Sequence, residues 1–165
     1  MTLIYGYADK LELNEKIYPV GDQNIMIIKI KKLNPEAKLP IYAHPGDAGM
    51  DFFALAETEI KPGEVVRVKT GIALELPVGY VGLIWDKSGL AANHGLKTMA
   101  GVLDAGYRGE LQIVVTNLSK EIYSIKKHDK VAQMLIQRIE SPELIEVDEL
   151  SDTSRGEGGF GSTGK

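Results

Sequence analysis

The sequence predicts an all-β fold of jelly-roll type, with one short helix and a flexible glycine-rich C-terminal arm. Seven short runs rich in β-branched residues follow one another between residues 25 and 139. All seven prolines lie outside these runs. Because proline cannot donate a hydrogen bond to a sheet ladder, this placement indicates strands separated by turns. Many short strands at such spacing are typical of a jelly-roll sandwich or barrel.

Turn signals separate the predicted strands, as at Pro62-Gly63. One segment, residues 88–93, is expected to be helical, with Ser88 placed to cap it. The strand predictions cover residues 25–31, 65–70, 72–76, 81–85, 111–116, 122–125 and 131–139.

The composition excludes several classes of protein. A chain of 165 residues fits a single domain. Its 19 Lys and Arg against 23 Asp and Glu give a formal net charge of −4, which argues against a domain that coats a DNA or RNA backbone. The absence of cysteine excludes disulfides, cysteine-zinc sites and thiol nucleophiles. No apolar stretch or basic leader predicts a membrane span or a secretion signal, so we expect a reducing, cytoplasmic setting.

Three parts are expected along the chain: an N-terminal extension at residues 1–24, a β domain at 25–150 and a flexible arm at 151–165. Residues 140–153 contain six acidic side chains and no Lys or Arg. The last ten residues contain five glycines. Glycine has the largest backbone entropy cost on ordering, so this end is not expected to pack as helix or strand by itself.

Two interpretations of the glycine-rich end stay open. One is a frayed, disordered terminus. The other is a lid that folds over a nucleotide, in which Arg155 offers a fork for phosphate and Phe160 a stacking surface. The glycines between them would free backbone N–H groups to wrap an anion.

Two further clusters carry possible chemistry. Residues 101–110 read most simply as a hairpin turn, but Asp104 beside Tyr107 can also orient a water as general base while the ring packs on a sugar or base. Residues 86–91 place Lys87 and Ser88 at a helix start, which is either an anion site or ordinary capping by Ser88. The Walker spacing is missing there.

Two weaker segments are a turn and strand at residues 48–54, which contains Asp51, and a turn and strand at residues 128–135, which contains Gln133. The three histidines are scattered and lack the spacing of a metal cage. No G-x-S-x-G elbow indicates a serine hydrolase.

Together and in this order, the five segments resemble the five motifs of the homotrimeric dUTP pyrophosphatases (dUTPases), over residues 25–165. The resemblance implies a distorted jelly-roll barrel whose three copies share their active sites, with the arm coming from a third subunit. It also implies hydrolysis of dUTP to dUMP and pyrophosphate with Mg²⁺, which limits uracil incorporation into DNA and supplies dUMP for dTMP synthesis. A viral member of the family would act inside the host cell.

The resemblance assigns a role to each motif residue. Asp104 would activate the water that attacks the α-phosphorus, and Asp51 would act near the metal through its bound waters. Tyr107 would pack under the deoxyribose and exclude a 2′-hydroxyl. The residues that would read the uracil edge are Gly101, Val102, Leu103 and Gln112. The residues that would hold phosphates are Lys87, Ser88, Gly89 and Gln133. From the arm, the contributors would be Arg155 at the γ-phosphate, Phe160 on uracil, and Gly161 with Ser162 over the phosphates.

Departures from the family pattern concentrate at the second motif, which usually reads Pro-Arg-Ser-Gly and here begins Asp86-Lys87. Lysine stays cationic but lacks the bidentate fork of arginine. Asp86 could face away, pair with Lys87 or approach a metal, and the sequence leaves these alternatives open. Leu103 replaces the usual Ile, and His128 stands where Gly is common.

Two rival functions remain. One is dCTP deamination, which a similar fold supports, although the Tyr107 hairpin and the Phe160 arm match the hydrolase better. The other is a non-catalytic nucleotide-sensing or protein-binding module, against which the presence of Asp104, Tyr107 and the arm argues.

Overall fold

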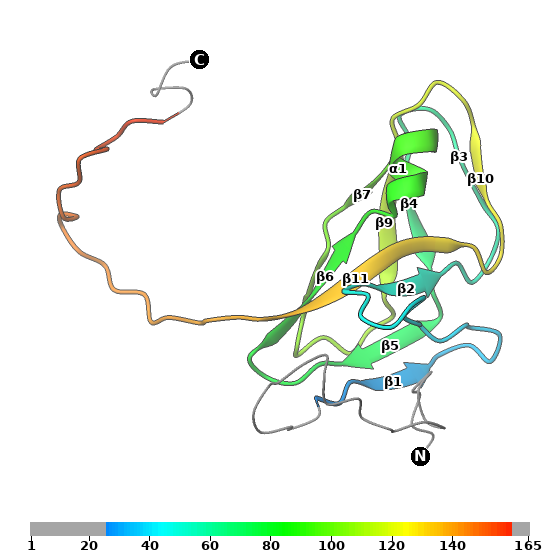
Figure 1. Ribbon diagram of the computed structural model, residues 1–165, viewed down its shortest axis with the longest axis horizontal. Coiled ribbons are helices and arrows are strands. Elements are labelled where there is room, and N and C mark those ends of the chain that lie inside the picture. Colours follow the sequence, from blue (N-terminus) through cyan, green and yellow to red (C-terminus); the bar gives the residue numbers. More distant parts are fainter. Residues whose placement is uncertain (1–25, 160–165) are drawn as a thin grey trace.

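Strands make up nearly all of the regular structure of the protein. A computed structural model describes residues 26–159, and within them eleven strands and one helix follow one another (Figure 1). In chain order they are β1 (Lys29–Lys32), β2 (Met50–Phe53), β3 (Thr58–Ile60), β4 (Val65–Lys69), β5 (Ile72–Glu75), β6 (Tyr80–Trp85), α1 (Ser88–His94), β7 (Leu96–Met99), β8 (Val102–Asp104), β9 (Gln112–Asn117), β10 (Tyr123–Ile125) and β11 (Lys130–Arg138).

The strands form two larger sheets and two strand pairs, all antiparallel. One sheet has the order β2-β11-β6-β8 and the other β4-β9-β7, while β1 pairs with β5 and β3 with β10. A single apolar core joins them, since Phe52 and Met134 of the first sheet lie in the same buried cluster as Ile113 of the second. Within residues 26–159 no sheet closes on itself, so the fold is a jelly-roll-like arrangement of open sheets.

The sequence predictions agree with this architecture over most of its length. Each of the seven predicted runs corresponds to one observed strand, and the predicted helix is α1. Sequence patterns missed β3, β7 and β8, which have only three or four residues each. The expected capping by Ser88 is wrong: the N-cap residue of α1 is Lys87, and no side-chain capping bond forms among the described residues.

The longest strand, β11, determines where the polar side chains of the site lie. It runs between β2 and β6 and contacts both, with Gln133 opposite Asp51 on one side and opposite Trp85 on the other. A register shift between Lys130 and Ala132 marks a bulge at its start. These pairings bring three distant segments of the sequence to one end of the sheet.

The turn that leads into β11 explains why glycine suits position 128. His128 has a φ of 70°, in the left-handed region that disfavours residues with a Cβ. Its backbone N–H donates to the Ala54 carbonyl at 2.8 Å, and its ring Nε2 lies 3.0 Å from the Glu36 carbonyl. The turn therefore keeps its left-handed shape without glycine, and the imidazole gains a tertiary contact.

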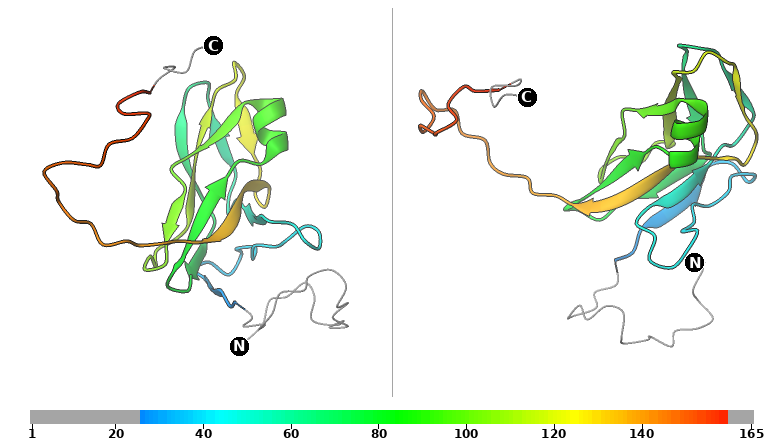
Figure 2. Two further views of the ribbon diagram at one scale, coloured as in Figure 1. Left: turned by 60° about the vertical axis from the view of Figure 1, so that its left-hand side comes forward. Right: turned by 45° about the horizontal axis from the view of Figure 1, so that its top comes forward.

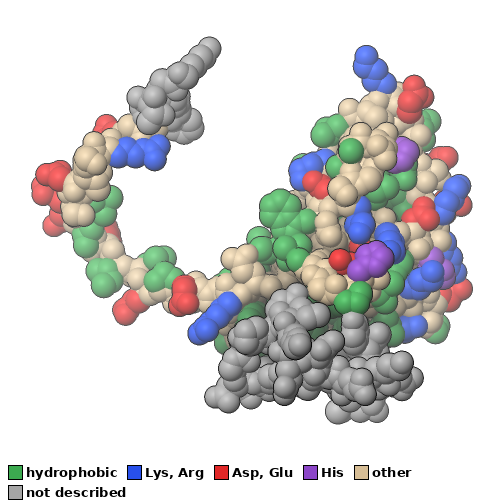
Figure 3. Space-filling model, in the orientation of Figure 1, with side chains coloured by type: hydrophobic (Ala, Val, Ile, Leu, Met, Phe, Trp, Pro, Cys, Tyr) green, Lys and Arg blue, Asp and Glu red, His purple; other side chains and the backbone are tan. Residues whose placement is uncertain are grey.

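Beyond β11, residues 139–159 form no helix or strand and extend away from the β sheets (Figures 1 and 2). Acidic and hydrophobic side chains alternate along this C-terminal segment (Figure 3). Its larger apolar side chains are all exposed, namely Ile139, Leu144, Ile145, Val147 and Leu150. The described part of the chain has no helix with the length and apolarity to cross a membrane.

The end of β9 depends on one buried amide. Asn117 is completely buried, and its Nδ2 donates to the Ile60 carbonyl at 2.8 Å and to the Glu121 carbonyl at 2.7 Å. Its Oδ1 accepts from the Ser119 N–H at 2.9 Å. The amide thus joins β9 to β3 and to the loop before β10.

We expect Asn117→Ala to lower the free energy of unfolding by about 1–3 kcal/mol, because it leaves the buried Ile60 carbonyl without this donor. Ser119→Ala is the matched control, since it removes one hydroxyl and leaves the amide contacts to Ile60 and Glu121 in place. Denaturant unfolding of both variants measures the difference. Equal and small losses would show that the amide does not join these strands.

Candidate active site

The polar residues singled out from the sequence gather at two places on the sheet β2-β11-β6-β8. The first, here called the lysine cluster, consists of Asp51, Lys87, Lys130 and Gln133 at the end of β6 that leads into α1. The second, here called the hairpin pocket, lies between β8 and β9.

A buried carboxylate is the centre of the lysine cluster. The Asp51 side chain is only 2% exposed, and its Oδ1 lies 2.5 Å from Lys87 Nζ while its Oδ2 lies 2.8 Å from Lys130 Nζ. The Lys130 contact is an ion pair whose geometry is not that of a good hydrogen bond, since Oδ2 has no hydrogen-bond partner within residues 26–159. Two ammonium groups against one carboxylate leave the cluster with a net positive charge, which suits an anionic ligand.

The ion pairs keep Asp51 ionised. Burial alone would raise its pKa, but the contacts with Lys130 and Lys87 outweigh burial, and the pKa of Asp51 lies below its ordinary value. A depressed carboxyl pKa contributes stability that is present at neutral pH and is lost as the pH falls through that lowered pKa. The Asp51 carboxylate is therefore ionised at neutral pH.

Gln133 is held in place by the segment that connects β6 to α1. Its Nε2 donates to the Asp86 carbonyl at 2.8 Å. Gly49 makes room for it, because a Cβ at that position would approach Gln133 Oε1 to 2.5 Å. Ser88 and Gly89 are exposed directly after Lys87, and nothing lies within 4 Å of the place a Gly89 side chain would occupy.

The three alternatives for Asp86 are resolved by the structure. Its carboxylate faces β7 and forms an ion pair with Lys97, at 2.6 Å, and no contact with Lys87 is described. Burial would raise its pKa, yet the contacts with Lys97 and Thr98 lower the pKa of Asp86 below its ordinary value. Its negative charge is thereby neutralised away from the lysine cluster.

The hairpin pocket has a volume of about 330 Å³, and its lining includes the four residues to which the family resemblance gives the uracil edge. Gly101 has a φ of 130°, and a Cβ there would lie 2.9 Å from the Ile84 carbonyl oxygen. Its own carbonyl accepts from the Ile84 N–H at 2.8 Å. Only glycine permits this close approach to β6, so the glycine determines how β8 starts. Leu103 is buried, whereas Val102 and Asp104 are exposed.

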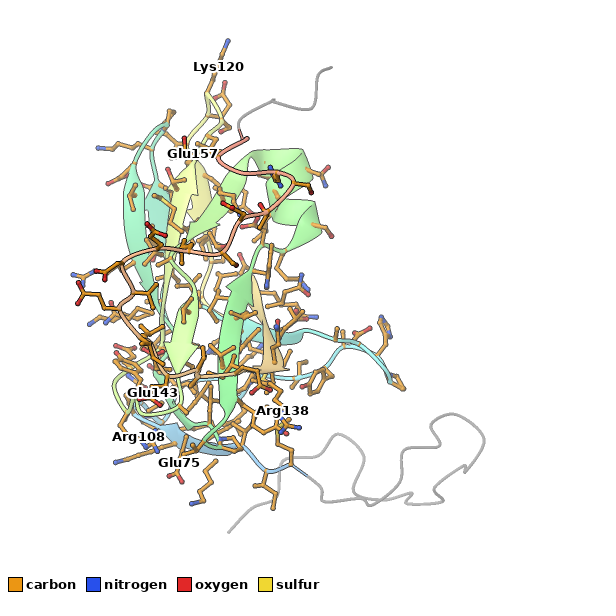
Figure 4. The ribbon with its side chains drawn as sticks, turned by 90° about the vertical axis from the view of Figure 1, so that its left-hand side faces the viewer. Glu75, Arg108, Lys120, Arg138, Glu143 and Glu157 are labelled. Carbon is orange, nitrogen blue, oxygen red and sulfur yellow. The ribbon has the colours of Figure 1, made fainter. Side chains whose placement is uncertain are left out.

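Tyr107 lies against the turn of the hairpin. Its hydroxyl donates to the Glu110 carbonyl at 3.0 Å, and its N–H donates to the Asp104 carbonyl at 3.1 Å. The ring leaves no space for a side chain at Gly109, where a Cβ would lie 2.6 Å from Tyr107 Cζ. Arg108 closes the turn from outside, donating to the Ala105 carbonyl at 2.5 Å, and lies near Glu75 at its base (Figure 4).

Three further residues at these two places were not assigned by sequence reasoning. Arg67 of β4 lines the hairpin pocket, and Glu110 accepts from the Gly71 N–H at 2.9 Å while its other oxygen lies 3.4 Å from Gln112 Nε2. Lys130 stands in the turn and strand at residues 128–135, and its cationic side chain is a signal for an anion site there. Arg67 gave no signal, because only the pairing of β4 with β9 brings it to the pocket.

Within a single chain, the lysine cluster and the Asp104 end of the hairpin pocket lie far apart. Asp104 pairs with Val81 near the start of β6, whereas Lys87 follows the end of the same strand. Lys87 is the sixth residue after Val81, and at about 3.3 Å per residue of extended chain this is roughly 20 Å. The phosphate-binding and water-activating residues implied by the motifs therefore lie at opposite ends of one strand.

The described part of the glycine-rich arm, residues 151–159, is not folded onto either place. Arg155 donates from Nε to the Gly158 carbonyl at 2.8 Å within a local turn. Glu143 and Glu157 mark the C-terminal segment in Figure 4, and Figures 1 and 2 show it extending away from the sheets. Phe160, Gly161 and Ser162 lie outside the described residues.

The described side chains do not form a metal cage by themselves. No group of three or more His, Cys, Asp or Glu residues that could hold an ion occurs within residues 26–159. Both oxygens of Asp51 lie against lysine ammonium groups, so Asp51 does not fit as a direct ligand. The residues fit a Mg²⁺ ion held mainly by phosphate oxygens and water, which is how this cation is commonly bound with nucleotides.

Comparisons with known proteins agree on one family. Residues 35–164 match the family model described as dUTPase. The chain is 50% identical over 139 residues to the deoxyuridine 5′-triphosphate nucleotidohydrolase of Alkaliphilus metalliredigens, an alignment that covers 83% of this chain and 96% of that protein. It is 48% identical over 140 residues to the corresponding protein of Thermobifida fusca, covering 83% of this chain and 78% of the relative.

Solved structures give the same result. The dUTPase of Staphylococcus bacteriophage 80alpha with dUpNHpp is similar with a TM-score of 0.78 and 34% identity, covering 84% of this chain and 99% of that chain. A mutant dUTPase of phage phi11 of S. aureus is similar with a TM-score of 0.70 and 31% identity, covering 74% of this chain and 97% of that chain. The structure of that mutant concerns the coordination of a structural Mg(II) ion. With the family model spanning most of the sequence, this chain belongs to the dUTPase family.

Proposed function

We propose that the protein hydrolyses dUTP to dUMP and pyrophosphate at sites assembled between subunits of a homotrimer. Relatives named as dUTP nucleotidohydrolases support the reaction, and the complex of the phage 80alpha dUTPase with dUpNHpp supports the ligand. The observation that carries the assembly is the position of Asp104 and Lys87 at opposite ends of β6. A symmetric oligomer can place one end of β6 from one subunit beside the other end from its neighbour.

The hairpin pocket would bind the nucleoside. Backbone groups of Gly101, Val102 and Leu103, with Gln112 on the returning strand, would read the uracil edge in place of a pairing base. The Tyr107 ring would pack under the deoxyribose and leave no space for a 2′-hydroxyl. Because Tyr107 is tied at its hydroxyl and its N–H to the hairpin backbone, the ring is a rigid surface for a sugar.

Asp104 would act as the general base. It is exposed at the end of β8, where water can reach it, and it borders the pocket. As the water oxygen bonds to the α-phosphorus, its proton passes to the Asp104 carboxylate. The bond from the α-phosphorus to the bridging oxygen breaks, and pyrophosphate leaves with that electron pair.

The lysine cluster would hold the phosphate chain. Lys87, Ser88, Gly89 and Gln133 would contact phosphate oxygens, and Asp51 would orient Lys87 and accept hydrogen bonds from metal-bound water. Mg²⁺, when bound, would neutralise charge on the triphosphate. Phosphoryl transfer depends mainly on positioning and charge stabilisation, so a cluster of this kind is sufficient.

The arm of a third subunit would close the site. Arg155 would contact the γ-phosphate, Phe160 would stack on uracil, and Gly161 with Ser162 would cover the phosphates. The extension of residues 139–159 away from the chain's own sheets supports a destination on another subunit. In the cell we propose a cytoplasmic role in limiting uracil incorporation into DNA and in supplying dUMP.

Asp104→Asn tests the role of the base. We expect turnover of dUTP to fall by about 10²–10⁴-fold, the usual effect of losing a general base, because the amide cannot accept the proton. Binding of dUpNHpp should stay within about threefold, since one charge change leaves the pocket shape intact. Pyrophosphate release and calorimetry measure the two quantities. Asp148→Asn in the C-terminal segment is the matched control and should turn over dUTP normally. Normal turnover by Asp104→Asn would show that Asp104 is not the general base.

A substrate panel tests the reaction itself. With Mg²⁺, we expect pyrophosphate release from dUTP at least about 100-fold faster than from UTP, dTTP or dCTP, because Tyr107 would exclude a 2′-hydroxyl and the hairpin backbone would read the uracil edge. Ammonia release from dCTP without pyrophosphate release from dUTP would instead indicate a deaminase. Binding of dUTP with no product of either kind would indicate a nucleotide-sensing module.

A further inference from the structure

Asp86 occupies the short connection between the end of β6 and the start of α1, and within residues 26–159 the donors to its carboxylate all come from β7. Its Oδ1 accepts from the Thr98 N–H and from the Thr98 hydroxyl, both at 2.6 Å. Its Oδ2 lies 2.6 Å from Lys97 Nζ. The side chain is 21% exposed, and Thr98 is buried, so water competes weakly for these bonds.

The other side of the same residue faces the lysine cluster. The Asp86 carbonyl accepts from Gln133 Nε2 at 2.8 Å, and the next residue, Lys87, forms the ion pair with Asp51. Asp86 thus contacts β7 through its side chain and β11 through its backbone. It is the point where these two strands and the start of α1 are joined.

Few other described contacts hold the start of the helix: Lys87 reaches Asp51 through its side chain, and Leu90 packs, partly buried, against the core. Lys87 is the N-cap residue, has an extended conformation with φ −80° and ψ 122°, and within residues 26–159 makes no side-chain capping bond. The first turn of α1 contains no acidic residue and none of its residues is buried. Without Asp86, the position of the Lys87 backbone would depend on the long Lys87 side chain at Asp51 and on a seven-residue helix that contains no fully buried residue.

We propose that Asp86 is a positioning residue for dUTP hydrolysis. It anchors the β6–α1 connection to β7 and thereby holds Lys87 and Gln133 where they meet the phosphate chain. The inference rests on the proposed function of those two residues. Charged hydrogen bonds of this length are strong and directional, and a shift of about 1 Å in a positioning group can cost on the order of 10²-fold in rate.

The first experiment compares Asp86→Ala with Asp86→Asn and with the control Glu57→Ala. Glu57 is also a carboxylate paired with a lysine and a hydroxyl, those of Lys126 and Ser124, but it has no contact with the lysine cluster. For Asp86→Ala we expect kcat/KM for dUTP to fall about 10- to 100-fold. Asp86→Asn, which keeps an oxygen for Thr98, should recover most of that loss, and Glu57→Ala should match the wild type.

A second readout separates positioning from general loss of structure. Affinity for magnesium pyrophosphate should fall at least about tenfold in Asp86→Ala, while affinity for deoxyuridine, which has no phosphate, stays unchanged. Equal pyrophosphate affinity in Asp86→Ala and wild type would overturn the proposal, as would a parallel loss of deoxyuridine affinity. Where Asp86→Ala does not fold, Thr98→Val removes one of the three bonds, and the same comparison applies with a smaller loss of pyrophosphate affinity.

The variant Lys87→Met distinguishes a failure of the positioning role of Asp86 from a failure of the proposed phosphate-binding role of Lys87. Unchanged pyrophosphate affinity in Lys87→Met would contradict the role of Lys87 and with it the basis of the inference. A large loss in Lys87→Met together with no loss in Asp86→Ala would overturn the role of Asp86 alone. Losses in both variants that are not additive in the double variant would support the proposal.

Discussion

The ion pairs of Asp51 with Lys87 and Lys130 connect the fold to the site. A carboxylate that is 2% exposed needs opposite charge beside it, because an unpaired ion in the interior is strongly destabilising. The two lysines come from the start of α1 and from the start of β11, so neutralising Asp51 draws both segments towards β2. Removing the side chain of either Lys87 or Lys130 would leave the charge of Asp51 only partly compensated.

That arrangement also explains how an acidic chain can bind a nucleotide. The formal net charge of −4 argues against a polymer-coating surface, but it does not prevent one local cluster with an excess of ammonium groups. Asp86, the nearby acid, is neutralised by Lys97 on the opposite side of the connection. The positive charge of the lysine cluster therefore stays available for phosphate.

Sequence reasoning predicted most of the fold, for physical reasons that also explain its errors. Runs of β-branched and other apolar residues indicate strands, which is why β9 and β11 were found, whereas β3, β7 and β8 stand in no such run. The expected cap at Ser88 failed because the chain stays extended through Lys87, whose side chain is engaged by Asp51. No local pattern reports that tertiary contact.

The candidate site likewise has residues that sequence motifs predicted and features that only the structure shows. Asp104, Tyr107 and Lys87 were predicted because they stand in motifs, and glycine at 101 now has a steric reason in its approach to Ile84. The direction of Asp86 was beyond the sequence, because it depends on β7, a strand that was not predicted. The distance along β6 between Asp104 and Lys87 likewise required the pairing register.

The claim that one active site combines both ends of β6 from different subunits can be tested by mixing two inactive variants. Asp104→Asn and Lys87→Met subunits are denatured together in equal amounts, refolded, and assayed for pyrophosphate release from dUTP. Random assembly should restore activity in about a quarter of the sites, since each site then has an even chance of receiving each intact residue. If both residues act from the same chain, no mixed trimer contains an intact site, and the mixture will stay as inactive as either variant alone.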